Sequence, residues 1–133
     1  MGTRATTKVL NENGDIILSM YSQYDGYPEG LGKDLANFLK QITMVNGIRF
    51  EEKRKVANGM GCLAAQLVAE FKKSAGGYYL TKPDDTESYN YTIYSEGDFD
   101  NQILKIKVEN SSNILFDDKV ENYNLFEDDK VEN

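Results

Sequence analysis

Hydrophobic and polar residues alternate near the start of the chain, and this alternation predicts a β-hairpin over residues 6–24. On the second strand Ile16, Leu18 and Met20 share one face, and the residues between them share the other. Asn13-Gly14 lies between the two strands and is a strong signal for a tight turn. The chain therefore begins with two antiparallel strands.

Two later stretches have the spacing of amphipathic helices. The first follows a loop at residues 25–32, which is rich in glycine. The second begins after Asn58, a suitable N-cap residue, and ends at Gly76-Gly77. The apolar faces consist of Leu31, Leu35, Phe38, Leu39 and Ile42 in the first helix and of Met60, Leu63, Ala64, Leu67, Val68 and Phe71 in the second.

Three further strands are predicted at residues 78–81, 89–94 and 103–108. A chain of 133 residues is long enough for one hydrophobic core. The pattern predicts an α+β fold in which two amphipathic helices pack on an antiparallel sheet. The N-terminal hairpin begins this sheet, and the three C-terminal strands complete it.

The C-terminal region contains a repeat, LFDDKVEN at Leu115–Asn122 and LFEDDKVEN at Leu125–Asn133. We expect residues 1–110 to form the single α+β domain and residues 111–133 to form an acidic repetitive tail. Two copies are too few for a solenoid. The tail is either solvated and weakly paired, or Ile114-Leu115-Phe116 or Leu125-Phe126 docks on a sheet edge of the same or another subunit.

Acidic charge is concentrated in this tail. The formal net charge is −7, and residues 109–133 contain eight acidic and two basic residues. The remainder is nearly neutral, so broad nucleic-acid binding is not expected. No apolar run reaches the roughly 18 residues needed to span a membrane, and no apolar signal segment opens the sequence. We therefore expect a cytoplasmic protein.

The chain contains no histidine and one cysteine, Cys62. Catalysis by a Ser-His-Asp or Cys-His arrangement is excluded, and no cofactor or metal site is predicted. Cys62 is expected to be a buried structural residue. The remaining enzymatic hypothesis is a metal-dependent nucleotide phosphodiesterase built on Asp25 and Glu29, with Asp34 as a third carboxylate. Solvated or helix-capping roles for these acids are the simpler alternative.

Two glycine-bearing segments, residues 24–32 and 58–62, lie directly before or at the predicted helix starts. Such a position offers backbone N–H groups and the positive end of a helix dipole to a phosphate. Flanking tyrosines would stack on a base, and an arginine would pair with the phosphate. The alternative is that the glycines permit tight turns and close packing, with the tyrosines in the core. The predicted ligand-binding residues are Arg4, Tyr24, Tyr27, Gly30, Gly32, Asn58, Gly59 and Gly61.

The motifs GTR, YDGYPEG, NGMGCLAAQLVA and GGYYL resemble a family of small, uncharacterised proteins of bacteriophages and some large viruses. The resemblance covers roughly residues 1–96, and Leu31 and Glu70 stand where members of that family often carry histidine. It implies a viral counter-defence protein in the host cytoplasm. Such a protein would sequester a nucleotide immune second messenger, and we expect a homo-oligomer. The alternative is a protein–protein inhibitor that acts on a host defence protein through its sheet edge or acidic tail.

Overall fold

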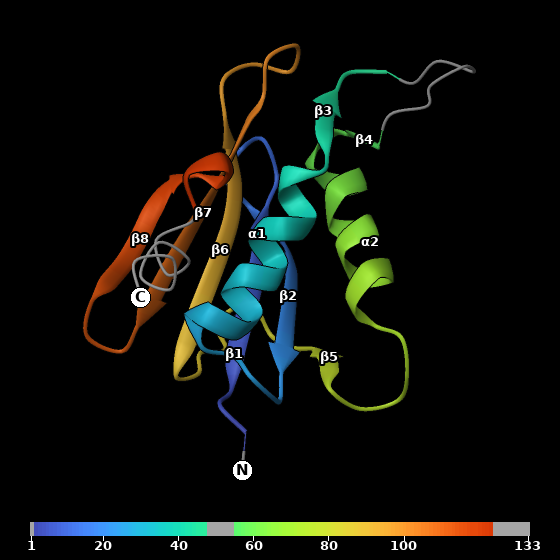
Figure 1. The fold of residues 1–133 in the computed structure, drawn as a ribbon. Coiled ribbons are helices and arrows are strands. Elements are labelled where there is room, and N and C mark those ends of the chain that lie inside the picture. Colours follow the sequence, from blue (N-terminus) through green and yellow to red (C-terminus); the bar gives the residue numbers. More distant parts are fainter. Residues whose placement is uncertain (1, 48–54, 124–133) are drawn as a thin grey trace, which may run out of the picture.

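In the part of the chain that the structure describes, two α-helices and a six-stranded sheet form the body, and a small two-stranded sheet lies beside them (Figure 1). The computed structural model describes residues 2–47 and 55–123. The α+β fold class predicted from the sequence is confirmed. The elements are β1 (Ala5–Leu10), β2 (Ile16–Ser22), the π-helical turn η1 (Pro28–Gly32), α1 (Lys33–Lys40), β3 (Thr43–Val45), β4 (Val56–Asn58), α2 (Gly59–Phe71), β5 (Tyr78–Leu80), β6 (Tyr89–Glu96), β7 (Ile103–Asn110), β8 (Ile114–Lys119) and the 3₁₀ turn η2 (Val120–Asn122).

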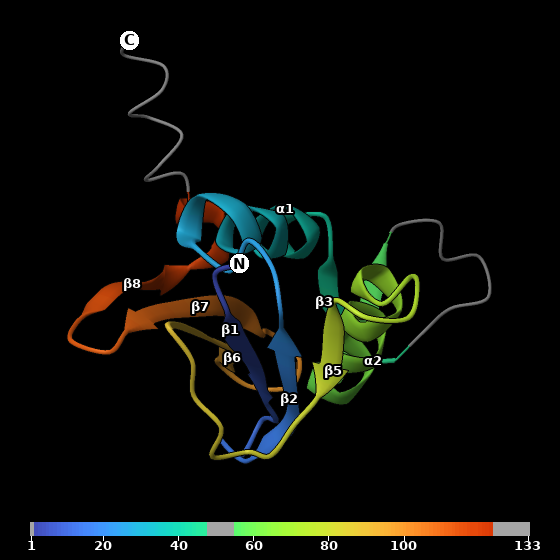
Figure 2. The same ribbon diagram turned by 90° about the horizontal axis from the view of Figure 1, so that it is seen from below.

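The large sheet has the order β5-β2-β1-β6-β7-β8, and both helices cover one of its faces (Figures 1 and 2). The hairpin and the three C-terminal strands lie where the sequence predicts them. The sheet is mixed rather than antiparallel, because β1 and β6 run parallel, with Thr7 opposite Tyr91. The other neighbouring pairs are antiparallel. A sixth strand, β8, joins the sheet beyond the strands that were predicted.

The parallel pair arises from the connection between β5 and β6. This segment, residues 81–88, leaves one edge of the sheet and crosses to β6 on the face opposite the helices (Figure 2). Ser19 Oγ donates a hydrogen bond to the Lys82 carbonyl at 2.9 Å, and Lys8 Nζ donates to the Asp85 carbonyl. Asn90 accepts from the Glu87 N–H and donates to its carbonyl, each at 3.0 Å. These contacts attach the connection to the open face of the sheet.

The core lies between the sheet and the helices, as the apolar spacing predicts. Leu35 and Leu39 of α1 and Leu63 and Leu67 of α2 are buried against the strands. Phe38 of α1 packs edge-on against a second ring at the end of α2. Complete burial of one such leucine contributes about 1.5–3 kcal/mol relative to exposure. The helices are therefore fixed to the sheet mainly by their apolar faces.

The first copy of the C-terminal repeat belongs to the sheet. β8 pairs antiparallel with β7, so Ile114-Leu115-Phe116 docks on a sheet edge of its own subunit. Val120 and Tyr123, just beyond β8, are only 3% and 4% exposed. Of the two alternatives for this copy, docking is the one that the structure shows. The second copy, Leu125–Asn133, lies outside the described residues.

Candidate functional site

The glycines before α1 are required by close packing. A Cβ atom added to Gly32 would lie 2.2 Å from Tyr123 Oη, and one added to Gly30 would lie 2.6 Å from the Asp25 carbonyl oxygen. Real Cβ atoms do not approach other atoms so closely. For these two positions the structure supports the alternative interpretation, in which glycine permits close packing.

Buried tyrosine hydroxyls close this loop from the core side. Tyr91 Oη donates to the Gly26 carbonyl at 2.7 Å, and Tyr123 Oη donates to the Pro28 carbonyl at 3.0 Å. Burial raises the pKa of both phenols, so each stays a neutral hydrogen-bond donor. The two hydroxyls and the two loop carbonyls therefore satisfy each other within the chain.

The backbone N–H groups of the same loop are also used internally. The Gly30 N–H donates to the Tyr27 carbonyl, and the Leu31 N–H donates to the Asp25 carbonyl, both at 2.9 Å. A phosphate could reach these donors only by replacing the internal bonds. The segment is thus a packed turn rather than an open anion cradle.

Three predicted site residues remain accessible at this end of the sheet. Tyr24 and Tyr27 are 57% and 39% exposed, and Arg4 is also exposed. They lie on adjoining segments, because the Gly26 N–H donates to the Thr3 carbonyl at 2.9 Å. The structure therefore retains two exposed rings and one cation on neighbouring segments here.

The glycine segment at the start of α2 is capped by a carboxylate of the chain itself, beside a cavity of about 240 Å³ that Asn58, Gly59 and Gly61 help to line. Glu12 Oε2 accepts from the Met60 N–H at 2.8 Å and from Gln102 Nε2 at 2.9 Å. Gly59 has φ of +84°, a conformation that favours glycine, and a Cβ there would lie 3.2 Å from the same oxygen. Glu12 thus occupies the position at which an external anion would meet the helix.

The N-cap residue of α2 is Asn58, as the sequence predicts, but its side chain does not cap the helix. Its Oδ1 accepts from the Gly47 N–H at 2.8 Å instead. Glu12, distant in sequence, supplies the cap. Desolvation alone would raise the pKa of Glu12, but the bonds from Met60 and Gln102 outweigh it and lower this pKa below its ordinary value.

The two glycine segments lie at opposite ends of β1. The first contacts Thr3 and Ala5 at the beginning of the strand, whereas the second contacts Glu12 just after its end. A strand rises about 3.3 Å per residue, so the length of β1 places the two contacts on the order of 20 Å apart. The eight predicted residues therefore do not form one site within a single chain. In Figure 1 the two helices likewise begin toward opposite ends of the sheet.

The cysteine and the candidate metal-binding acids are dispersed. Cys62 is half-buried and packs at the margin of the core, where full burial was expected. Asp25 adopts a positive φ of 56° in the loop before η1. Within residues 2–47 and 55–123, no group of three or more acidic or cysteine side chains is arranged to hold a metal ion. Asp25, Glu29 and Asp34 thus form no such cluster.

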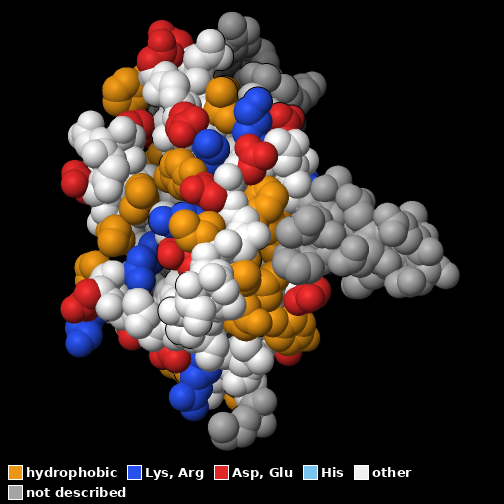
Figure 3. Space-filling view, turned by 90° about the vertical axis from the view of Figure 1, so that its left-hand side faces the viewer, with side chains coloured by type: hydrophobic (Ala, Val, Ile, Leu, Met, Phe, Trp, Pro, Cys, Tyr) orange, Lys and Arg blue, Asp and Glu red, His pale blue; other side chains and the backbone are white. Residues whose placement is uncertain are grey.

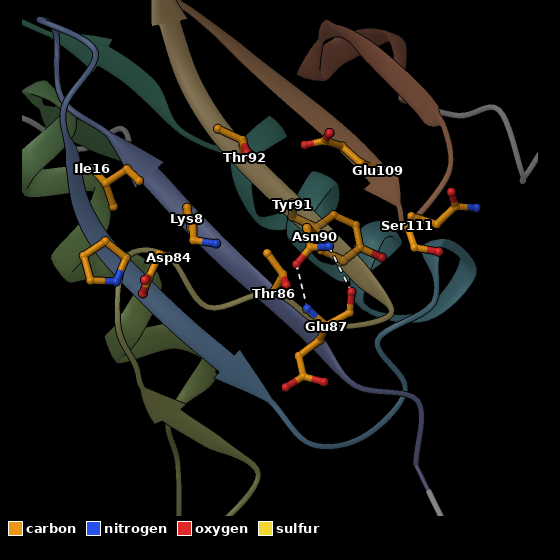
Figure 4. A pocket seen from close by; sticks show the side chains of 12 residues that line it. Lys8, Ile16, Asp84, Thr86, Glu87, Asn90, Tyr91, Thr92, Glu109 and Ser111 are labelled. Atoms are coloured by element: carbon orange, nitrogen blue, oxygen red, sulfur yellow. Dashed lines mark hydrogen bonds between the residues drawn. The ribbon is translucent and has the colours of Figure 1, made fainter.

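A cavity lies on the open face of the sheet, and none of the eight predicted residues lines it. We call it the open-face pocket; its volume is about 570 Å³ (Figure 4). Its walls are β1, the β5–β6 connection, β6, and the end of β7 with the turn that follows. The lining residues are Lys8, Ile16, Pro83, Asp84, Thr86, Glu87, Asn90, Tyr91, Thr92, Glu109, Asn110 and Ser111.

Sequence reasoning missed this pocket because its walls come from segments far apart in the chain. The local signal is a polar residue between two buried neighbours along a strand, as at Lys8 in β1 and Thr92 in β6. That alternation predicts which face of the sheet points outward. It does not predict that the β5–β6 connection forms one wall of the pocket. The parallel pairing, which places Lys8 opposite Thr92, supplies the missing information.

Comparison with protein-family models, with curated proteins and with solved structures gives no match to this chain. In the part of the chain that the structure describes, no helix is both long enough and apolar enough to cross a membrane.

Proposed function

We propose that this protein is a non-catalytic binding module that holds a small polar ligand in the open-face pocket. The observation that carries the proposal is the convergence of polar side chains from separate segments around a volume of about 570 Å³. Pockets for small molecules commonly measure about 300–1,000 Å³ and contain a few polar groups that orient the ligand. The pocket has the size and the kind of lining that such a ligand requires.

The charged side chains that line the pocket favour one class of ligand. The carboxylates of Asp84, Glu87 and Glu109 line the pocket together with a single cation, Lys8. The Lys8 ammonium already donates to the Asp85 carbonyl. The lining thus offers mainly hydrogen-bond acceptors and negative charge. A ligand with amino or hydroxyl donors fits this environment, whereas a phosphate would meet repulsion.

A panel of small molecules tests this function by heteronuclear NMR on the full chain. The panel contains polyamines, amino sugars, amino acids and nucleotides. Thr92→Trp should fill the pocket and weaken binding of the ligand by at least tenfold. Ser112→Trp, in the turn between β7 and β8 and outside the lining, is the matched control. Unchanged affinity in a folded Thr92→Trp protein would contradict the proposal.

Nucleotide capture is the second candidate, and the exposed rings of Tyr24 and Tyr27 beside Arg4 favour it. Aromatic faces stack on bases, and a guanidinium pairs with phosphate. The resemblance to phage and large-virus proteins provides the biological setting, in which the ligand would be an immune second messenger. This candidate uses only the N-terminal part of the predicted site, because Gly59 and Gly61 lie at the other end of the sheet.

Mass spectrometry of protein purified from cells that produce nucleotide signals tests the second candidate. An intact nucleotide in the heat-released fraction, lost in Arg4→Ala and Tyr24→Ala but kept in Gly61→Ala, would support it. A processed nucleotide would favour a phosphodiesterase. Absence of any nucleotide, with a folded protein and confirmed signal production, would exclude capture.

A further inference from the structure

The two edges of the large sheet differ in whether they can accept another strand. The β5 edge has only three residues, and Lys72 Nζ donates to the Gly76 carbonyl at 3.1 Å and to the Tyr78 carbonyl at 2.6 Å. The ammonium group therefore occupies carbonyls that a new strand would need. Natural proteins commonly protect sheet edges with short strands and lysines of this kind.

Within residues 2–47 and 55–123, the β8 edge is twice as long as the β5 edge, and no lysine donates a hydrogen bond to its carbonyls. β8 spans six residues, Ile114–Lys119, and is the last strand on its side of the sheet. Its inner side is paired with β7. A strand of this length presents a row of backbone donors and acceptors to a further strand. The β8 edge is thus the side of the sheet that is open to augmentation.

Side chains divide the β8 edge into an apolar half and an acidic half. Ile114 is 61% exposed, and Leu115 and Phe116 are half-buried. Asp117 and Asp118 follow directly, on opposite faces of the strand. Seen from the side of β8, hydrophobic and charged side chains are interspersed over the surface (Figure 3).

Both carboxylates are held in place by hydrogen bonds within the chain. Asp117 Oδ1 accepts from the Tyr94 hydroxyl. Asp118 accepts from the Lys119 N–H at 2.7 Å and from Asn122 Nδ2 at 3.1 Å, and these bonds lower its pKa. The nearby ion pairs between described residues join Lys105 to Glu96 and Lys107 to Glu109. Lys107 also lies opposite Asp117 across the β7–β8 pair, and Lys105 and Lys119 interact electrostatically with Asp118.

We propose that the β8 edge binds an extended segment of a partner protein in which two adjacent basic residues precede a short apolar run. In antiparallel pairing, such a segment would set its basic residues opposite Asp118 and Asp117 and its apolar residues opposite Phe116, Leu115 and Ile114. Opposite charges and apolar pairs directly across two strands are favourable. This partner is independent of the small ligand in the open-face pocket.

A second copy of this chain does not fit the edge equally well. If β8 paired with itself along its whole length in antiparallel fashion, Phe116 would face Asp117 and Leu115 would face Asp118. The second repeat, Leu125–Asn133, is itself acidic, with Glu127, Asp128, Asp129 and Glu132 against Lys130. Charge complementarity therefore favours a basic partner from another protein.

Titration of the isotopically labelled full chain with two matched peptides tests the proposal. The probe is acetyl-Thr-Lys-Lys-Val-Ile-Val-Thr-amide, and its control replaces both lysines with glutamates. The expected result is a set of amide shifts in β8 with the basic peptide and at least tenfold weaker binding of the acidic one. Equal binding of the two peptides, or shifts concentrated at β5, would overturn the proposal.

A pair of charge variants completes the test. Asp117→Asn with Asp118→Asn should weaken binding of the basic peptide about tenfold. Asp15→Asn with Glu70→Gln removes the same formal charge at two exposed positions elsewhere and should leave binding unchanged. Undiminished binding in the folded β8 variant would overturn the proposal.

Concentration-dependent shifts in β8 without peptide would identify a second copy as the occupant. Binding that occurs only after removal of residues 124–133 would identify the chain's own C-terminal segment.

Discussion

The two glycine segments precede helices in a similar way but are closed by different groups. The segment before α1 is closed by the hydroxyls of Tyr91 and Tyr123, which satisfy its carbonyls from within the core. The start of α2 is closed by the Glu12 carboxylate, which satisfies an N–H from outside the helix. In both cases the chain provides the partner that an external ligand would otherwise supply. A glycine-rich helix start therefore indicates an anion site only when no distant side chain reaches it.

The largest effect is expected for Gly32→Ala, which adds a methyl group to the closed segment. The new Cβ would lie 2.2 Å from Tyr123 Oη and 3.1 Å from a ring carbon of Tyr91, and both rings are buried. Displacing them should lower the free energy of unfolding by about 1–3 kcal/mol. Urea unfolding measures this change. A stability equal to that of the wild type would show that the packing is looser than the structure indicates.

Tyr123→Phe should have the next largest effect. It removes the hydroxyl that donates to the Pro28 carbonyl and leaves that buried acceptor without this bond. The expected loss is about 1–2 kcal/mol of unfolding free energy, because an unsatisfied buried polar group is costly. Chemical denaturation checks the value. Tyr94→Phe, which removes a hydroxyl bonded to an exposed aspartate, is the control and should cost less.

Gly61→Ala should raise the free energy of unfolding, whereas the two preceding substitutions lower it. Gly61 lies inside α2, and no atom lies within 4 Å of an added Cβ. Replacing a helical glycine by alanine should stabilise the protein by about 0.5–1 kcal/mol. A rise in midpoint temperature would confirm that this glycine has no packing role. A fall would show that Gly61, like Gly32, is required by its surroundings.

The smallest effect is expected for Glu12→Gln, which weakens the cap of α2. The loss should be about 0.5 kcal/mol near neutral pH, because the carboxylate is largely screened by solvent. The pKa of Glu12 is lowered in the folded state. Its contribution is therefore complete above the unfolded-state pKa and is lost as the pH falls through the folded-state pKa. Unfolding of both proteins across the acidic range should show the difference shrinking with falling pH; a difference that grows would contradict the assignment.

Local patterns were sufficient to predict most of the elements. The turn at Asn13-Gly14, the apolar faces of both helices and the alternation in β7 depend on neighbouring residues, and all lie where expected. The parallel pairing of β1 with β6 and the cap from Glu12 depend on residues far apart in sequence. The predicted site combined residues 24–32 with residues 58–62 because both segments place glycines at a helix start. This local similarity does not indicate that the two segments lie at opposite ends of β1.

We predict that a ligand occupies the open-face pocket and does not bridge the two glycine segments. The most direct test is amide chemical-shift mapping of the full chain with the tightest-binding molecule from the panel. The predicted result is a set of changes at Lys8, Thr92, Glu109 and Asn110. Simultaneous changes at residues 24–32 and 58–61, with none in the pocket, would contradict the account.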